Sequence, residues 1–300
     1  MPVIDPIIQK QETDIISQKY TTMLILAGLF CLILFAGCAM SPNIQQPAAR
    51  TVNTPPGSMG EKDVARLIPQ FDAYAGEIFG KSRVPGMAVA VIKNDSVIYL
   101  RSFGVKNLTT REPVGPDTRF QLASISKTFT SASIASMVGR GELSWDDRVA
   151  TLNPGFRLSD PWVSDHVTIR DLLMHRTGLP AYAGDELQDI GYNRQEVTSK
   201  LRLVPLTGDY RSSYAYSNIG MTSAAEAAAK KAGMSWEDLV ADRVLVPAGM
   251  KNTSARFADF EKAADRVDTY SMMNGTPVAG PLLNDDVNSP AGGVSSTING

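Results

Sequence analysis

Two neighbouring β-rich runs set the strongest limit on how this chain can fold. The runs are "GMAVAVIK" and "SVIYLRSFG", joined at Asn94-Asp95, and this pattern predicts a β-hairpin. A two-stranded hairpin is marginally stable at best in water, so it needs other elements to pack against. Directly before it, apolar residues recur at helical spacing and predict a helix over residues 61–80.

The sequence after Phe120 has a mostly helical pattern. Ser/Thr-x-x-Asp sequences, which are typical of helix starts, begin at Ser144, Thr168 and Ser235. An alanine-rich segment, "NIGMTSAAEAAAKKAG", predicts a long helix that ends at Gly233. Together these elements predict the α+β class, with an antiparallel sheet flanked by helices that leads into a helical lobe.

Composition and charge argue against several classes of function. The 300 residues are 43% hydrophobic and 20% charged, which is typical of a globular protein with one large domain or two small ones. A net charge of −2 gives no electrostatic footprint for nucleic acid. The two histidines, His166 and His175, form no metal-ligand pattern, and the sequence has no G-x-S-x-G element. We expect no metal, no cofactor and no nucleic-acid partner.

The N-terminal region contains one apolar run, within residues 23–40. The run is about 15 residues long, which is short for a membrane span and typical of a signal-peptide core. It holds both cysteines of the chain, Cys31 and Cys38. The run ends in "LFAGC", which resembles a bacterial lipobox, although Phe35 stands where Leu is more usual.

The resemblance to a lipobox implies that residues 1–38 are a lipoprotein signal peptide and that Cys38 is lipidated. The body of the protein is then exported and anchored to the membrane on the periplasmic side of the cell envelope. Ala39 gives no aspartate retention signal, which favours the outer membrane in a Gram-negative cell. An uncleaved N-terminal anchor and a later translation start at Met23 are the alternatives.

Residues 39–60 are rich in Pro, Gly and small polar residues and show no apolar period. Such a composition predicts a flexible tether between the anchor and the folded domain. The domain itself is predicted to begin at Glu61 and to extend over residues 61–300.

Ser124 and Lys127 form the first candidate for chemistry, in "FQLASISKTFT". Residues three apart lie on the same face of a helix, and the helix predicted to begin here would offer free N–H groups to developing negative charge. A lysine held beside a serine in a partly desolvated site can act as its base. The alternative is an N-capping serine followed by a surface lysine.

Tyr216 and Asn218 form the second candidate, in "YAYSNIG" just before the alanine-rich helix. A tyrosine at this junction can reach back to Ser124, and beside the lysine it can carry protons to a leaving group. Asn218 can orient a substrate amide. The alternative is a packed tyrosine followed by an N-capping asparagine.

With these motifs in order, the chain resembles the serine β-lactamase and penicillin-binding-protein superfamily, on its class C and esterase side. The resemblance implies that Ser124 is the acylated nucleophile, Lys127 its activating partner, Tyr216 a proton relay and Asn218 a substrate contact. It covers residues 61–300. Its segments are "VPGMAVAVIKND", "FQLASISKTFT", "GRGELSWDDRVA", "VTIRDLLMHRTGLP", "YAYSNIG" and "SPAGGVSST".

The family pattern has a third element, Lys-Thr-Gly or His-x-Gly, on the strand that lines the opposite wall of the site. The segment "HRTG" at His175 looks similar but precedes Tyr216, so we interpret His175 as structural, hydrogen-bonded to the following loop. No other candidate follows Tyr216. We therefore expect the C-terminal part of the sheet to be missing from this chain, and with it half of the oxyanion hole, which typically costs ~10²–10³ in rate.

The leading hypothesis is a serine hydrolase that forms an acyl-enzyme with an amide or ester. The substrate is a small molecule or a peptidoglycan-type peptide: a β-lactam, a D-Ala-D-Ala-type peptide, a D-amino-acid amide or an ester. Fold-level resemblance does not select among them. The alternatives are a non-hydrolytic penicillin- or peptidoglycan-binding sensor module and an inactive truncated product.

Overall fold

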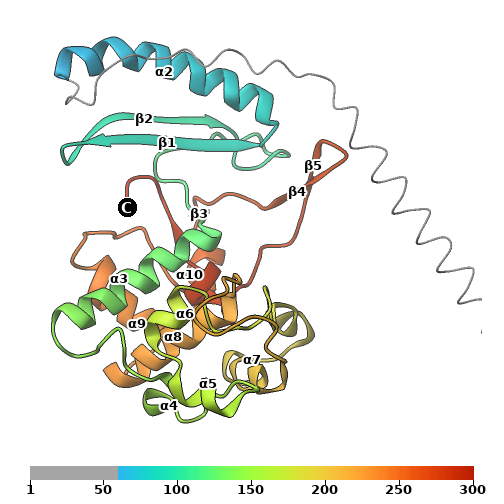
Figure 1. The fold of residues 1–300 in the computed structure, drawn as a ribbon. Helices are drawn as coiled ribbons and strands as arrows, with labels where there is room; N and C mark the ends of the chain where they lie inside the picture. Colours follow the sequence, from blue (N-terminus) through green and yellow to red (C-terminus); the bar gives the residue numbers. More distant parts are fainter. Residues whose placement is uncertain (1–59) are drawn as a thin grey trace, which may run out of the picture. The chain divides into compact units, whose positions relative to one another are not determined.

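Helix α2 (Glu61–Ser82) is the first element of the computed structural model, which describes residues 60–300 (Figure 1). Residues 61–300 form one compact unit by their internal contacts. The predicted signal peptide over residues 1–38, with Cys38, lies outside the described residues, as does the predicted tether except for Gly60.

The predicted hairpin is confirmed. Strands β1 (Gly86–Lys93) and β2 (Ser96–Gly104) pair antiparallel along their whole length. Asn94 and Asp95 both have positive φ, 49° and 58°, as a tight two-residue hairpin turn requires.

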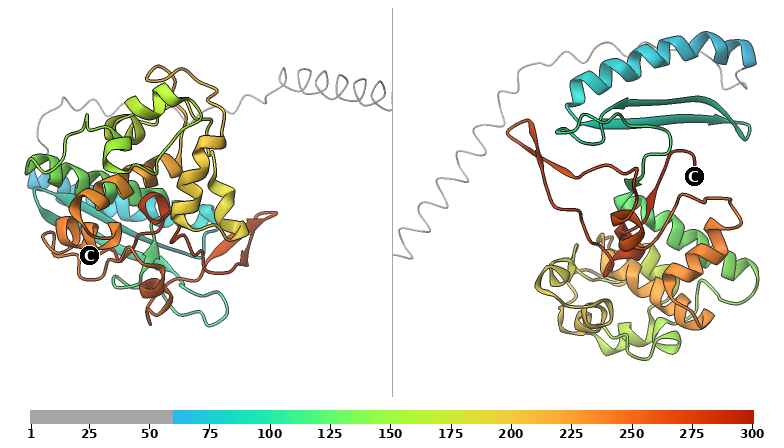
Figure 2. Two further views of the ribbon diagram at one scale, coloured as in Figure 1. Left: turned by 90° about the horizontal axis from the view of Figure 1, so that it is seen from below. Right: turned by 180° about the vertical axis from the view of Figure 1, so that it is seen from behind.

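Helix α2 packs on this hairpin through aromatic side chains. Phe71 contacts Tyr99 edge to face at 5.0 Å between ring centroids, and Phe79 stacks on Phe103 at 5.6 Å. The Tyr99 hydroxyl donates to Asp72 Oδ1 at 2.8 Å. Burial of these rings on one side of the hairpin supplies the packing that two strands lack. Figure 2 shows α2 and the hairpin side by side, on one side of the helical lobe.

The remaining strands of the described region form two short antiparallel pairs. Strand β3 (Phe120–Gln121) pairs with β6 (Ser295–Ser296), and β4 (Tyr270–Met273) pairs with β5 (Thr276–Ala279). The α+β class is therefore confirmed. The strands of residues 60–300, however, form three separate two-stranded sheets rather than one sheet.

Helices make up most of the lobe that follows β3. The α-helices are α3 (Ser126–Gly139), α4 (Val149–Leu152), α5 (Pro161–His166), α6 (Ile169–Leu173), α7 (Arg194–Lys200), α8 (Asn218–Ala232), α9 (Trp236–Val240), α10 (Phe257–Glu261) and α11 (Ser289–Gly292). The 3₁₀ helices are η2 (Ala123–Ile125), η3 (Asp185–Ile190) and η4 (Leu201–Leu203), and η5 (Ala241–Leu245) is a π-helix.

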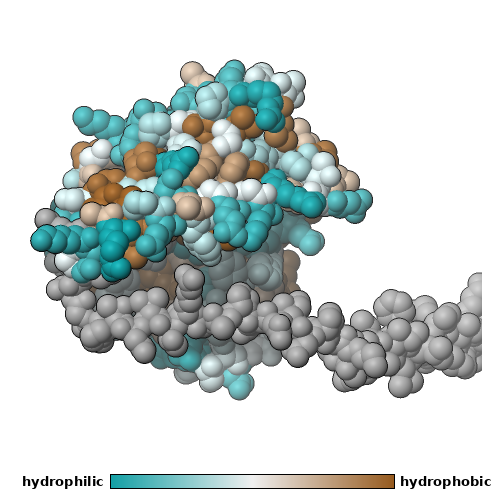
Figure 3. All heavy atoms as spheres, turned by 90° about the horizontal axis from the view of Figure 1, so that it is seen from above, coloured by the Kyte–Doolittle hydropathy of each residue, from teal (hydrophilic) through white to brown (hydrophobic). Residues whose placement is uncertain are grey.

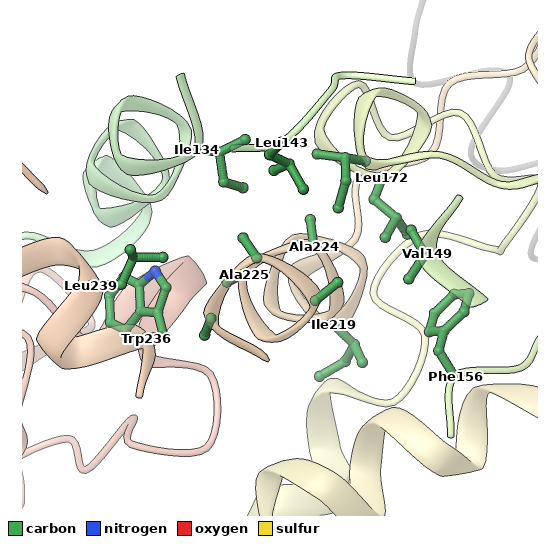
Figure 4. Close-up of a cluster of buried hydrophobic side chains, with 14 of the residues drawn as sticks. Ile134, Leu143, Val149, Phe156, Leu172, Ile219, Ala224, Ala225, Trp236 and Leu239 are labelled. Carbon is green, nitrogen blue, oxygen red and sulfur yellow. The ribbon is translucent and has the colours of Figure 1, made fainter. Parts of the chain in front are cut away.

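Helix α8, predicted from its alanine content, is the centre of the hydrophobic core. Ala224 and Ala225 have no exposed surface and lie between Ile134 of α3, Leu172 of α6 and Trp236 of α9 (Figure 4). The small alanine side chains allow α8 to be surrounded on several sides. Each fully buried large side chain of this cluster contributes about 1.5–3 kcal/mol to stability.

Two of the three predicted helix caps are present. Thr168 and Asp171 form a complete capping box at α6, and the Ser235 side chain accepts from the backbone N–H of Asp238 at α9. The prediction at Ser144 is wrong, because there the bond from its N–H to the Asp147 carboxylate closes a turn and no helix begins.

Seen from the side of α2, hydrophilic side chains alternate with separate apolar ones (Figure 3). Among residues 60–300, no helix is both long enough and apolar enough to cross a membrane.

Candidate active site

Ser124 is placed by the short link between β3 and α3. It lies in the 3₁₀ turn η2 and is exposed, whereas Ser126, the first residue of α3, is buried. The Ser126 side chain, fully buried, accepts from Val294 N at 2.9 Å and fixes this turn against the C-terminal region. Ala123 has φ of 45°, a left-handed conformation that is unfavourable for alanine. Local strain of this kind is frequent at functional sites.

The structure brings Ser124, Lys127 and Tyr216 together. Ser124 Oγ lies 2.7 Å from Tyr216 Oη, and Lys127 Nζ donates to Ser124 Oγ at 3.2 Å. Lys127 Nζ also lies 4.7 Å from the centroid of the Tyr216 ring. The serine hydroxyl is therefore within hydrogen-bond reach of two groups able to exchange protons with it.

Lys127 Nζ has three acceptors. Besides Ser124 Oγ, it donates to Asn218 Oδ1 at 2.7 Å and to the carbonyl oxygen of Ala291 at 2.8 Å. An ammonium has three N–H donors, so these bonds use its whole capacity. The fourth predicted site residue, Asn218, is thus part of the same cluster, and the alternative of a surface lysine is excluded.

Tyr216 is positioned by the start of α8 and by two loop residues. Ser217 caps α8 by accepting from Gly220 N, which fixes the backbone just after Tyr216. The Tyr182 N–H donates to the Tyr216 carbonyl at 2.8 Å, and the two rings lie 5.5 Å apart. Tyr182 and His175 both have positive φ, 60° and 56°.

The hydrogen bond of the His175 side chain differs from the expected one to the loop that follows it, because its partner is Ser217 at the start of α8. The Nδ1 atom of His175 accepts from Ser217 N at 3.1 Å, and the His175 ring lies 5.0 Å from that of Tyr216. Burial lowers the pKa of His175, and the charge of Lys127 lowers it further. A neutral imidazole keeps the Nδ1 lone pair that accepts this hydrogen bond.

Two carboxylates near the cluster were missed in the sequence. Asp185 of η3 accepts from Asn218 Nδ2 at 2.6 Å, which fixes the amide with Oδ1 facing Lys127. Burial raises the pKa of Asp185, against the hydrogen bond from Asn218 and the charge of Lys127. Burial also raises the pKa of Asp285 to about 6. Neither aspartate belongs to a sequence motif that would indicate a site residue, because each is brought to the site by tertiary packing.

Helix α11 is held in place by a third residue that the sequence did not mark, Arg194. Its partly buried guanidinium donates to Glu226 at 3.0 Å, to Glu237 at 2.6 Å and to Ser289 Oγ at 2.9 Å. The bidentate capacity of arginine suits such a network. Since Ala291 lies two residues after Ser289 in the same short helix, Arg194 helps to position the carbonyl that accepts from Lys127.

A cavity of about 330 Å³ opens beside Ser124. Its wall combines residues of η2, η3, α8 and the segment that ends in α11. The lining residues are Gln121, Ala123, Ser124, Asp185, Gln188, Asp189, Asn218, Leu283, Asn284, Asp285, Asn288, Ala291 and Gly292. A larger cavity of about 480 Å³ around residues 251–263 contains none of the four predicted site residues, so we assign the chemistry to the smaller one.

Among residues 60–300, no group of His, Cys, Asp and Glu side chains is arranged to hold a metal ion. The chemistry available to the described cluster is nucleophilic attack by a serine beside a lysine and a tyrosine.

A family model described as Beta-lactamase matches residues 64–300. This chain belongs to the beta-lactamase family. The resemblance noted in the sequence is thereby confirmed. Penicillin-binding protein 4 of Amycolatopsis lactamdurans is 32% identical over 194 residues, which cover 63% of this chain and 48% of that protein.

Solved structures of the family share the fold. The octameric penicillin-binding protein homologue from Pyrococcus abyssi superposes with a TM-score of 0.66 at 25% identity, covering 77% of this chain and 54% of that one. A class C beta lactamase superposes with a TM-score of 0.65 at 25% identity, covering 80% and 64%. The chain spans about half the length of the curated relatives that it matches.

Proposed function

We propose that this chain is a serine hydrolase of the β-lactamase, DD-peptidase and esterase type, which forms an acyl-enzyme on Ser124. The observation that carries the proposal is the 2.7 Å contact between Ser124 Oγ and Tyr216 Oη, beside Lys127 Nζ at 3.2 Å. A serine needs an adjacent proton acceptor to become a useful nucleophile. Membership of the beta-lactamase family supports the same reaction class.

In the proposed acylation, Ser124 Oγ attacks an amide or ester carbonyl carbon and its proton passes to Tyr216. The Lys127 ammonium, whose three N–H groups are already bonded, stabilises the phenolate that accepts this proton. Tyr216 then gives the proton to the leaving amine or alcohol, and the bond from the carbonyl carbon to that group breaks. Water repeats the sequence to release the acyl group, so the role of each residue is the same in both halves.

The negative charge on the substrate oxygen is stabilised by preorganised donors. The Ser124 backbone N–H, in the turn that leads into α3, is proposed as one of them. Asn218, fixed by Asp185, offers an amide to orient the substrate. No cofactor takes part in this scheme.

The acyl group comes from one of four classes: a β-lactam, a D-Ala-D-Ala-type peptide, a D-amino-acid amide or a simple ester. All four present a carbonyl to a serine and need the same proton transfers. The matched proteins include a penicillin-binding protein and a class C beta lactamase, which supports the β-lactam class, while the shared fold does not select among the four.

Intact-mass spectrometry tests the proposal. The segment Ser41–Gly300 is incubated with a penicillin and, separately, with an activated ester, next to the Ser124→Ala variant. We expect an acyl adduct on the parent chain and none on Ser124→Ala. An adduct that persists for hours without product release would support a penicillin-binding module in place of a hydrolase, and an adduct that survives the substitution would refute the assignment of Ser124.

We further propose that the domain acts at the cell envelope, tethered by a lipid on Cys38. The proposal rests on the apolar run within residues 23–40 and on the sequence "LFAGC".

A further inference from the structure

All charged residues that line the cavity beside Ser124 are acidic. Three of its lining residues are aspartates, Asp185, Asp189 and Asp285, and none is lysine, arginine or histidine. The other polar groups of its wall are mostly side-chain amides. Because Ser124 lines this cavity, a substrate group that occupies the cavity while Ser124 reacts meets this charge.

Three acceptor oxygens around this cavity are buried without a hydrogen-bond donor. They are Gln121 Oε1, Asp185 Oδ1 and Gln188 Oε1, and all three residues line the cavity. Buried acceptors are nearly always paired in folded proteins, so unpaired ones next to a reactive serine require an explanation. A bound group with several N–H donors would provide one.

Asp285 places a third anionic group on the α11 side of the cavity. A Cβ added at Gly292 would lie 2.0 Å from Asp285 Oδ2, so the carboxylate lies directly against the helix backbone and depends on the glycine for space. Burial of this carboxyl keeps water from solvating it fully. It has no lysine or arginine partner within 4.0 Å, in contrast to the aspartates that form ion pairs elsewhere among residues 60–300.

Lys127 offsets the charge of the cavity only in part: its charge lowers the pKa of both Asp185 and Asp285, but it is a single cation. Its ammonium is directed at Ser124, Asn218 and the carbonyl of Ala291, and it is not among the lining residues. One cation beside Ser124 stands against three aspartates that line the cavity. A substrate carboxylate would therefore be repelled from this cavity, whereas a cation would be attracted.

We infer that this cavity binds a primary ammonium group of the substrate, held by Asp185 and Asp285 while Ser124 attacks a nearby carbonyl. The inference rests on the proposed function and narrows it to amides or esters with a free amino group close to the scissile bond. A primary ammonium carries three donors and one positive charge, which matches the unpaired acceptors and the carboxylates of the wall.

The test compares matched substrates on the full chain in detergent. D-Alanyl p-nitroanilide carries the free ammonium, N-acetyl-D-alanyl p-nitroanilide lacks the charge, and succinyl p-nitroanilide is anionic; p-nitrophenyl acetate reports Ser124 reactivity alone. We expect kcat/KM for the free amine to exceed that for the acetylated compound by at least about tenfold. We expect the anionic compound to react more slowly than both.

Variants assign the effect to the cavity. Asp285→Asn and Asp185→Asn should each reduce the ratio of kcat/KM between free and acetylated substrate by about tenfold or more. This ratio cancels a general loss of activity, which Asp185→Asn also causes through Asn218. Glu186→Gln is the matched control, because Glu186 lies on the same turn η3, is exposed and does not line the cavity. It should leave the ratio unchanged.

A measurement without variants gives a second test. n-Butylammonium should protect Ser124 from acylation by p-nitrophenyl acetate, whereas n-butanol at the same concentration should not. Equal rates for free and acetylated substrate together with no protection would overturn the inference while leaving the proposed function intact. A p-nitrophenyl acetate reaction that does not depend on Ser124 would instead refute the proposed function.

Discussion

The carbonyl oxygen of Ala291 accepts a hydrogen bond from Lys127 Nζ at 2.8 Å, joining the first turn of α3 to α11. A second bond, from Thr130 Oγ1 to the carbonyl of Pro290 at 2.8 Å, parallels it. Because these bonds end on backbone atoms, the side chains of α11 do not show in the sequence that this helix belongs to the site. The position of α11 therefore matters more to Lys127 than the identity of its residues.

Gly292→Ala should damage the site without entering the reaction. The added methyl would lie 2.0 Å from Asp285 Oδ2, so either Asp285 or α11 must move. We expect a loss of about 1–3 kcal/mol in the free energy of unfolding, together with slower acylation by an activated ester. Chemical denaturation and adduct formation measure the two effects.

Gly139→Ala is the control for this substitution. Gly139 ends α3, and a Cβ there meets no atom within 4 Å. It should change neither the stability by more than about 1 kcal/mol nor the acylation rate. Equal effects of the two substitutions would show that α11 has more freedom than its contacts indicate.

Tyr216→Phe should slow acylation by about 10²–10⁴ and leave the fold intact. The substitution removes only the hydroxyl at 2.7 Å from Ser124 Oγ and keeps the ring that packs near His175 and Tyr182. Stopped-flow or manual-mixing mass spectrometry of the adduct gives the rate. Tyr182→Phe, on an exposed ring next to Tyr216, serves as the control, and a similar loss there would contradict the role given to Tyr216.

Asp285→Asn should change how stability depends on pH. The pKa of this carboxyl is raised from 3.8 to about 6, so the folded chain holds the proton more tightly than the unfolded chain. The contribution of Asp285 to stability is then fully present below pH 3.8 and is lost as the pH rises through about 6. The full change corresponds to about 3 kcal/mol as an upper estimate.

The measurement is the difference in unfolding free energy between parent and Asp285→Asn at several pH values. The charged groups that act on Asp285 are Lys127, Asp185 and Asp286, and all remain in the variant. We expect the variant to gain stability relative to the parent as the pH rises from 4 to 7. A constant difference over this range would contradict a raised pKa of the buried Asp285 carboxyl.

The sequence was sufficient for the elements and residues that have local signals. The hairpin was marked by Asn94-Asp95, α8 by its alanine content, and the contact between Lys127 and Ser124 by their spacing of three residues. Asp185 and Asp285 were missed because they lie far from Ser124 in the sequence and belong to no motif of their own. At Ser144 the opposite error occurs, because a local pattern is present without the predicted element. The hydrogen bond of the capping pattern forms there, but the chain makes a turn and does not continue as a helix.

Cys38→Ser should release the protein from the membrane fraction if the lipid anchor is correct. Cys38 is the cysteine of the lipobox-like sequence, and serine cannot be lipidated through a thioether. Cell fractionation followed by immunoblotting measures the distribution, and Cys31→Ser is the matched control within the same apolar run. Unchanged fractionation of Cys38→Ser would favour an uncleaved hydrophobic anchor.

Arg194→Met should destabilise the chain strongly. Arg194 pairs with Glu226 and Glu237, whose side chains are 27% and 14% exposed, so its removal leaves two largely buried carboxylates without a cation. Breaking a buried pair in this way typically costs about 3–5 kcal/mol. The same change frees Ser289 and the start of α11, so the acylation rate at pH 7 should fall in the fraction that remains folded.

Arg66→Met is the matched control, because the Arg66–Asp63 pair of α2 is 70% and 53% exposed. Exposed pairs contribute about 0–1 kcal/mol, so this variant should unfold at nearly the parent denaturant concentration. Lowering the pH separates the two roles of Arg194. Burial raises the pKa of Glu237 and the hydrogen bond from Arg194 lowers it, so in Arg194→Met only the effect of burial remains. Protonation of Glu237 as the pH falls should therefore recover part of the stability of Arg194→Met relative to the parent. A variant whose stability deficit is the same at pH 4 and pH 7 would show that Arg194 acts through packing instead of charge.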